Sequence, residues 1–382
     1  MNIEKRMSKR LIASTIAITL IFSFFSMTIS AEESINSYIL IESRTGTVID
    51  ECNSNVRTNA GFLTKLMTLL LIAEDIETGR MSLETELTAS QTVYGTKGSV
   101  IWLEPGDKMS VDELLKGAVI GNANDAITVL AEKSEGSIEN FTARMNSEAF
   151  DMGLRNTAFY SPYGYYNEEE YTTAYDLAMI CAELSKYEFM TTYFKTWRDF
   201  IREGQTELVS ENTLTRTYER HIGFKATHSD ESGYCIAEGG RSDDGTTYIA
   251  IVLGAADADT SFSEAKRLVK KGFNEFKVTV PGFLDELLRP VKVKNGVDSA
   301  VEVKLKAQST IVIPNGVSEL SNIIVMPEYV SAPLKKGQKI GTAAFYNGST
   351  LVYETDIVVQ NSVEKLSYDY IFKKMLLNLI GN

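Results

Sequence analysis

The stretch from Lys65 to Glu74, KLMTLLLIAE, is apolar around almost its whole circumference when drawn as a helix. Such a helix is stable only when other elements surround it, because no face of it suits water. A chain of 382 residues, of which 44% are hydrophobic, is long enough to supply that surrounding core. The sequence therefore predicts a globular protein in which residues 65–74 form a helix inside a domain.

Strand-like segments lie on both sides of a mostly helical middle. Residues 37–51 predict two strands around a tight turn, and three further β-rich segments follow Glu219. Helical patterns dominate between them as far as about Lys195, and a helix from about Ser263 to Phe276 closes the region. This order predicts an α+β domain over residues 32–277, with one antiparallel sheet assembled from both ends and helices packed on it.

Residues 278–360 change in character to short alternating segments joined by Gly, Pro and Asn. That pattern predicts a small all-β sandwich or barrel domain. The last segment, 361–382, has the period of an amphipathic helix. Its apolar face holds Tyr368, Ile371, Phe372, Met375, Leu376, Leu379 and Ile380, and its polar face holds Asp369, Lys373, Lys374 and Asn378.

This terminal helix has two interpretations. It could dock on its own β domain, or it could lie in a membrane interface, which its lysines and its place after a complete domain favour. At about 15 residues it is too short to span a bilayer. The N-terminal residues 1–31 have a basic start, a long uncharged apolar run and a small-residue end, which predict a secretory signal. An uncleaved anchor remains the alternative, and either way the rest of the chain lies outside the cytoplasm.

The composition excludes several classes of site. A net charge of -13 argues against a nucleic-acid partner, which would need a clustered basic surface. His221 and His228 are the only histidines, so a zinc site built on imidazoles is excluded and a Ser-His-Asp triad is disfavoured. Cys52, Cys181 and Cys235 are too scattered for a metal motif, and we interpret them as buried apolar residues rather than as one disulfide. We expect no metal and no cofactor.

Three short clusters carry candidate chemistry. FLTK at 62–65 opens the buried helix, NAN at 122–124 begins another apolar helix, and KAT at 225–227 lies in a predicted strand. Taken together, in this order, they resemble the three motifs S-x-x-K, S-x-N and K-T-G of the D-alanyl-D-alanine carboxypeptidases, the low-molecular-mass penicillin-binding proteins. The segments LTKLMT, GNANDA, GLRNTAFYSPYG, YTTAYDLA, TWRDFIR and SDESGYC also look like family segments.

The resemblance covers nearly the whole mature chain. It implies a β-lactamase/transpeptidase-like fold, a location at the outer face of the bacterial cytoplasmic membrane, and the peptidoglycan stem peptide as substrate. In this family the first serine attacks the D-Ala carbonyl and the lysine three residues later is its base. The second motif relays a proton and holds the substrate amide, and the third lies on an edge strand beside the substrate.

Matched residue by residue, Lys65, Asn124 and Lys225 remain, whereas the reactive positions are changed. The nucleophile position is Phe62, which has no oxygen or sulfur and cannot form an ester intermediate. The relay position is Asn122, whose amide cannot pass a proton as a hydroxyl does.

The third motif is altered as well, because Ala226 and Thr227 replace its threonine and glycine. Thr227 places a branched side chain where a substrate strand would approach. His228 and Ser229 follow and keep the strand end polar, so we include them among the substrate-binding positions.

No other residue is an obvious nucleophile. Thr64 points away from the Phe62 position on a helix, and two further S-x-x-K strings, 263–266 and 362–365, fall outside the expected site. The sequence thus predicts a catalytically inactive relative of these enzymes that binds peptidoglycan or an envelope protein. The alternatives are an active serine-type carboxypeptidase and a structural protein whose cleft binds nothing.

Overall fold

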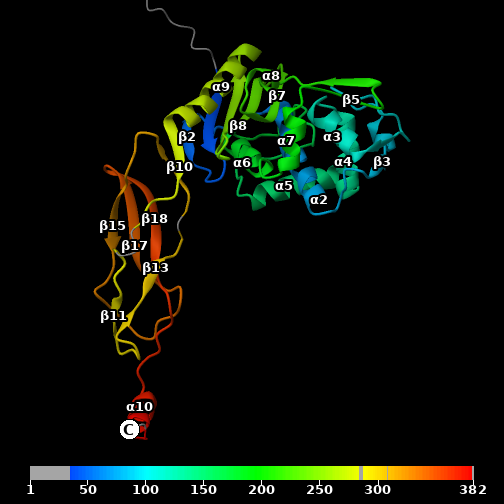
Figure 1. The fold of residues 1–382 in the computed structure, drawn as a ribbon. Coiled ribbons are helices and arrows are strands. Elements are labelled where there is room, and N and C mark those ends of the chain that lie inside the picture. Colours follow the sequence, from blue (N-terminus) through cyan, green and yellow to red (C-terminus); the bar gives the residue numbers. More distant parts are fainter. Residues whose placement is uncertain (1–34, 284–286, 308, 381–382) are drawn as a thin grey trace, which may run out of the picture.

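The computed structural model describes residues 35–283, 287–307 and 309–380. The predicted signal segment, 1–31, lies outside these described residues. Figure 1 shows a broad unit of helices around a sheet, followed by a narrower arrangement of strands and then by a single terminal helix. This is the α+β architecture with a small β region and a C-terminal helix that the sequence predicts.

The central sheet joins the two ends of the first unit. It has five antiparallel strands in the order β2-β1-β9-β8-β7. The strands are β1 Ser37–Glu42, β2 Val48–Cys52, β7 His221–Ser229, β8 Gly233–Arg241 and β9 Thr247–Ala255. The N-terminal hairpin joins the late strands through β1, which pairs with β9 over the full length of β1. At the other side, β7 pairs with β8 alone and forms a free edge of this sheet.

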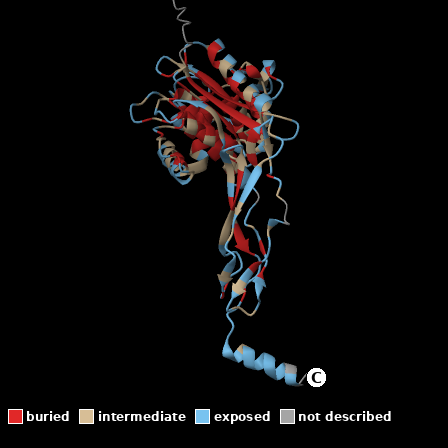
Figure 2. Cartoon of the chain, turned by 90° about the vertical axis from the view of Figure 1, so that its left-hand side faces the viewer, coloured by how far each residue is buried: buried red, intermediate tan, exposed pale blue. Residues whose placement is uncertain are grey.

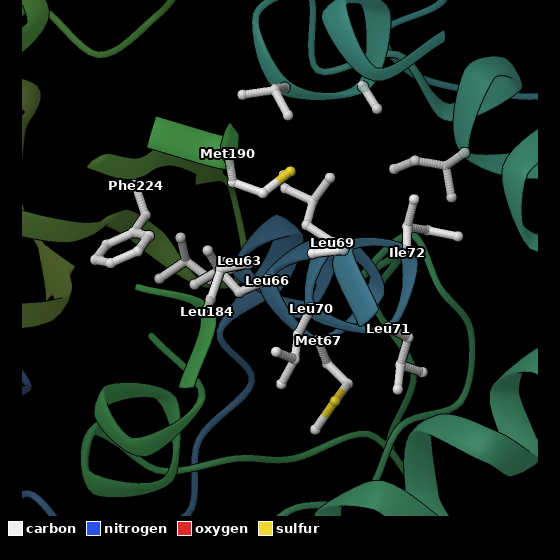
Figure 3. Packing of buried hydrophobic residues seen from close by; sticks show 14 of the residues in the cluster. Leu63, Leu66, Met67, Leu69, Leu70, Leu71, Ile72, Leu184, Met190 and Phe224 are labelled. Atoms are coloured by element: carbon white, nitrogen blue, oxygen red, sulfur yellow. The ribbon is translucent and has the colours of Figure 1, made fainter. Parts of the chain in front are cut away.

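Helix α2, Lys65–Glu77, lies at the centre of the helical layer on one face of the sheet. A 3₁₀ turn, η1 Gly61–Thr64, leads into it. Figure 3 shows its leucines packed in one cluster with Leu184, Met190 and Phe224 from other elements. The prediction of a fully surrounded helix is confirmed. Around it lie α3 Val111–Val119, α4 Asn124–Glu135, α5 Ile138–Asp151, α6 Ala174–Leu184 and α7 Glu188–Lys195.

Helix α9, Ala258–Glu275, covers the opposite face of the sheet and packs on β8 and β9. It begins five residues before the predicted start at Ser263, because Asp257 caps it by accepting a hydrogen bond from the Thr260 amide at 2.7 Å. The short helix α8, Leu214–Thr217, joins the same apolar cluster. Helices therefore cover both faces of the sheet, and Figure 2 shows its central strands largely as buried.

Two pairs of short strands lie outside the central sheet. They are β3 Glu86–Thr88 with β4 Lys108–Ser110, and β5 Arg198–Ile201 with β6 Thr206–Val209. A 3₁₀ turn, η2 Gln91–Val93, follows β3.

The C-terminal region is built from short strands, as predicted. Strand β10, Phe276–Thr279, pairs with β14, Ile311–Pro314, so the segment after α9 is tied to the region that follows. A three-stranded and a four-stranded sheet enclose an apolar cluster that includes Phe345 and Ile357. Their strands are β11 Val291–Lys294, β12 Ala300–Val301, β13 Val303–Leu305, β15 Ser321–Val325, β16 Tyr329–Ser331, β17 Lys339–Asn347 and β18 Thr350–Val359.

Helix α10, Tyr368–Ile380, has the predicted helical structure. Its apolar side chains are largely exposed, with Phe372 66% and Leu379 75% accessible, and Figure 2 shows the helix at the end of the molecule. Helix α10 is therefore not docked on the β region in this structure. Within the described part of the chain, no helix combines the length and apolar character needed to cross a membrane.

The cysteine prediction is partly wrong. Cys181 and Cys235 are buried thiols, but Cys52 is exposed near the end of the edge strand β2. All three are free, as expected. Burial raises the pKa of the Cys235 thiol, which keeps it uncharged.

Candidate active site

The ammonium of Lys65 lies at the centre of the candidate site and is held by one residue. Its Nζ donates to the Asn122 backbone carbonyl at 2.8 Å and to the Asn122 side-chain oxygen at 2.7 Å. Only 1% of Lys65 is accessible. Burial holds the pKa of this lysine well below its usual value, and the nearby charge of Lys225 lowers it further.

Asn122 can make both contacts because of its backbone conformation. Its φ is +56°, in the left-handed region that asparagine tolerates better than most residues. It stands two residues before α4, so the carbonyl and the side-chain oxygen converge on one donor. Asn122, at the position expected for the relay serine, therefore anchors Lys65.

Phe62 occupies the 3₁₀ turn that precedes Lys65 and is partly buried. The Lys65 Nζ lies 4.9 Å from the centre of the Phe62 ring, within cation–π range. The ring also meets Tyr165 edge to face, with centroids 6.4 Å apart. The space beside the lysine that a serine would leave open is thus taken by an aromatic ring.

The loop after α5 packs tightly on this turn. A Cβ added to Gly164 would stand 2.2 Å from the Gly61 carbonyl oxygen, and Gly164 has a φ of +81°. Only glycine allows this approach. The next residue, Tyr165, is thereby held against Phe62.

Asn124, the first residue of α4, faces the same loop. Its side-chain nitrogen donates to the Lys97 carbonyl at 2.8 Å and to the Tyr165 hydroxyl at 3.0 Å. The Tyr165 hydroxyl in turn donates to the Lys97 carbonyl at 2.6 Å. The side-chain oxygen of Asn124 is buried and, among the described residues, has no hydrogen-bond partner. An acceptor of this kind remains available for a ligand N–H or a water molecule.

Lys225 lies on the edge strand β7 and closes the other side of the site. Burial lowers the pKa of its ammonium to about 8, with Glu211 opposing the shift. No hydrogen-bond or ion-pair partner for its Nζ is found in the described part of the chain. A space of about 10 Å³ is lined by both Lys225 and Asn122. That is the lower limit for holding one water molecule, far from the volume of a peptide.

The remaining residues of the third motif divide between two sides of the strand. Ala226 packs into the apolar cluster on the α9 side, away from Lys65. Thr227 is buried, and its hydroxyl has no partner among the described residues. His228 is exposed and stacks on Tyr234, with ring centroids 5.1 Å apart.

Ser229 lies at the rim of the site, where it contacts a neighbouring serine. Its hydroxyl is 2.9 Å from that of Ser232 and accepts the Ser232 amide at 3.0 Å. The Ser232 hydroxyl is also close to the turn at Gly61, since a Cβ built there would be 2.8 Å away. The strand end and the turn before Lys65 are therefore in contact.

The hydroxyls weighed as substitutes for the nucleophile are all engaged elsewhere. Thr64 donates to the Glu170 carboxylate at 2.6 Å, and burial raises the pKa of that carboxyl. Ser263 lies on α9 and bonds its own helix, on the far face of the sheet. Ser362 accepts the Lys336 amide at 3.0 Å in the β region. None of the three faces Lys65.

The sequence interpretation missed two features of the site. One is the aromatic wall, by which we mean Tyr165 packed against Phe62, and the other is the Glu170 carboxyl that binds Thr64. Tyr165, Gly164 and Glu170 come from one loop that touches the first two motifs. The segment containing GLRNTAFYSPYG was noted as family-like, but nothing in its composition marks it as part of a site. In the part of the chain that the structure describes, no cluster of His, Cys, Asp or Glu could hold a metal ion.

Solved structures with the same architecture are penicillin-binding proteins. Penicillin-binding protein 5 from Haemophilus influenzae superposes with a TM-score of 0.79 and 23% identity, covering 87% of this chain and 98% of that one. The carboxypeptidase DacD from Francisella tularensis superposes with a TM-score of 0.73 and 24% identity, covering 87% and 94%. At these identities the similarity establishes the fold: that of the low-molecular-mass penicillin-binding proteins.

The sequence comparisons identify the family. Residues 26–257 match the D-alanyl-D-alanine carboxypeptidase model, and residues 283–365 match that of the penicillin-binding protein 5 C-terminal domain. The carboxypeptidase DacF of Bacillus subtilis is 31% identical over 345 residues, covering 89% of this chain and 88% of DacF. DacC of Escherichia coli K12 is 27% identical over 368 residues, covering 90% of each. The chain belongs to the D-alanyl-D-alanine carboxypeptidase family, as its motifs predict.

Proposed function

We propose that this chain is a catalytically inactive member of its family, exported and held at the outer face of the cytoplasmic membrane. There it acts by binding peptidoglycan stem peptides or an envelope protein. The observation that carries the proposal is the pairing of Lys65 with both oxygens of Asn122, with the Phe62 ring where the attacking hydroxyl would stand. Because Phe62 has no hydroxyl, Lys65 has no nucleophile to deprotonate, and acyl transfer cannot start.

The state of the surrounding cleft supports the same proposal. Thr227 brings a buried side chain to the edge strand β7, and the space beside Lys225 is about 10 Å³. An acyl group has no room in a space of that volume. In a well-studied serine hydrolase the loss of one triad member costs about six orders of magnitude in kcat. Here two of the reactive groups are replaced.

Binding without reaction remains compatible with the site. Asn124 keeps a buried, unpartnered oxygen, and Lys225 keeps a charged group beside a free sheet edge among the described strands. A peptide can add to such an edge through its backbone. Titration of the protein with muropeptides tests this role, since a ligand of the folded state raises the melting temperature. No shift at millimolar muropeptide would favour an envelope protein as partner, or a cleft that binds nothing.

The membrane location rests on α10. Its exposed apolar face, with Lys373 and Lys374 on the polar side, has the character of a helix that lies in a lipid interface. The predicted export signal at 1–31 is consistent with this place.

An active carboxypeptidase is the second candidate, favoured by the 31% identity to DacF over most of the chain. It would need another nucleophile. Ser210 has the only side-chain hydroxyl among the residues that line the space beside Lys225. Release of D-alanine from a pentapeptide, abolished by Ser210→Ala, would establish this alternative and refute inactivity.

A further inference from the structure

A basic groove lies on the side of the sheet opposite the candidate site. It runs between α8 and the C-terminal half of α9, which lie side by side in Figure 1. Its volume is about 510 Å³. It is lined by Thr217, Tyr218, Glu219, Arg220, Lys266, Lys270, Phe273 and Asn274. We call it the cation groove, after Arg220, Lys266 and Lys270.

The cations of this groove are oriented by the groove itself. The Arg220 guanidinium stands 4.7 Å from the centre of the Phe273 ring, and the Lys266 Nζ stands 5.6 Å from that of Tyr218. Lys266 also donates to the Thr217 carbonyl at 3.0 Å. Lys270 follows Lys266 by one helical turn, so both reach the same side of α9.

None of these three cations pairs with a carboxylate among the described residues, and the one acid in the lining, Glu219, is exposed. A fourth cation, Arg216, lies beside the groove on α8, over the Trp197 ring at 4.0 Å. The whole chain carries a net charge of -13, which repels anions at long range. The groove is therefore a local region of positive charge on a protein that is negative overall. Arg216, Arg220 and Lys266 each contact an aromatic ring there.

The lining indicates which anion fits. An acidic protein partner would need an apolar centre to bury, but the cations here cover the aromatic rings. Phosphate groups need only the charges, and an arginine fork beside lysine point charges binds them well. The groove also lies at the opposite end of the molecule from α10, with the small β region between them (Figure 1). A lipid headgroup at a membrane contacted by α10 would not reach it.

We propose that the cation groove binds a phosphate-bearing polymer in the space between the membrane and the cell wall. This second binding site is independent of the proposed role of the cleft, but it rests on the proposed export and membrane location of the chain. The polymer would lie across α9 with successive phosphates at Arg220, Lys266 and Lys270. Such binding would hold the α+β domain away from the membrane while α10 stays in contact with the lipid.

The test uses the full-length protein in a non-ionic detergent, with inorganic polyphosphate as the probe. The double variant Arg220→Gln/Lys270→Gln removes two exposed charges and the contact of Arg220 with the Phe273 ring, and thermal melting checks its fold. The matched control, Lys335→Gln/Lys336→Gln, removes two exposed charges from the β region. Poly-glutamate in the same detergent, and phosphatidylglycerol vesicles after removal of the detergent, serve as the competing ligands.

We expect the groove variant to lose about tenfold or more in polyphosphate affinity at 0.1 M salt and the control to change by less than about twofold. The slope of log affinity against log salt should flatten by about 1.4 in the groove variant, as for two lost phosphate contacts. Absence of binding by the unmodified protein, an equal loss in both variants, or tighter binding of poly-glutamate would overturn the proposal. Loss of vesicle binding without loss of polyphosphate binding would overturn it as well.

Discussion

The ammonium of Lys65 is bonded to two oxygens of a single residue, at 2.8 Å to the Asn122 carbonyl and 2.7 Å to its side chain. These two hydrogen bonds give the buried Lys65 polar partners in a helix that is otherwise apolar. Asn122 stands at the position expected for the relay serine, and its side chain binds the lysine expected to be the base. This arrangement is what the proposed inactivity of the site would require.

The anchoring role of Asn122 predicts a stability difference between two truncations. Asn122→Gly removes the side-chain oxygen but accepts the positive φ, so it should lower the free energy of unfolding by about 1–3 kcal/mol for the weakened contact to Lys65. Asn122→Ala should cost about 1 kcal/mol more, since alanine is strained in the left-handed region. Urea unfolding at pH 7 measures both. Equal stability of Asn122→Gly and the unmodified protein would show that Lys65 does not depend on this side chain.

The buried ammonium of Lys225 predicts a pH dependence. Its folded-state pKa of about 8 lies below the unfolded value of 10.5, so charging it costs stability in full below pH 8. The cost disappears as the pH rises from about 8 towards 10.5, where the unfolded chain still binds the proton. Lys225→Met should therefore be more stable than the unmodified protein at pH 7, by about 3 kcal/mol as an upper figure.

This stability gap is measured as a difference between the two proteins across pH 7–10, which cancels the titration of the buried tyrosines. It should narrow steadily above pH 8. A stability gap that is constant with pH would mean that Lys225 keeps an ordinary pKa. Its ammonium would then be more accessible to water than in the structure.

Much of this fold follows from the sequence, for reasons that particular segments make plain. The apolar run at 65–74 favours a buried helix, and the short β-rich segments separated by turn residues after Glu219 favour strands. The site was only partly predictable. That Asn122 would turn its carbonyl towards Lys65 depends on one backbone angle, and a local pattern does not specify it.

The aromatic wall was hidden for a different reason. Tyr165 reaches Phe62 because Gly164 allows two backbone segments, distant in sequence, to touch. Long-range contacts of this kind arise from tertiary packing and leave no periodic trace. The same holds for the cation groove, whose members at Arg220 and at Lys266 are brought together only by the docking of α8 on α9.

The exposed face of α10 predicts membrane binding. Deletion of 366–382 should abolish flotation of the signal-cleaved protein with anionic liposomes, because the apolar face supplies most of the binding energy. Phe372→Asp/Leu379→Asp should have the same effect in the full chain. Lys373→Gln/Lys374→Gln should weaken flotation only at low salt, since it removes a screened attraction. Unchanged flotation after the deletion would refute the anchor.

A four-residue revertant tests whether the site is otherwise intact. Phe62→Ser, Asn122→Ser, Ala226→Thr and Thr227→Gly together restore the three motifs, remove the ring over Lys65 and free its ammonium from the asparagine. Some acylation by a β-lactam should return. The matched control retains Phe62 and carries the other three changes, and it should stay unreactive. Acylation of that control would show that a residue other than 62 is the nucleophile.

The central claim is that the unmodified protein cannot form an acyl-enzyme. Its most direct test is the intact mass of the purified protein after incubation with benzylpenicillin, with the revertant and a working family member measured alongside. The account predicts an unchanged mass for this chain, because Phe62 offers no atom for an ester. A stoichiometric penicilloyl adduct, one per chain, would contradict it.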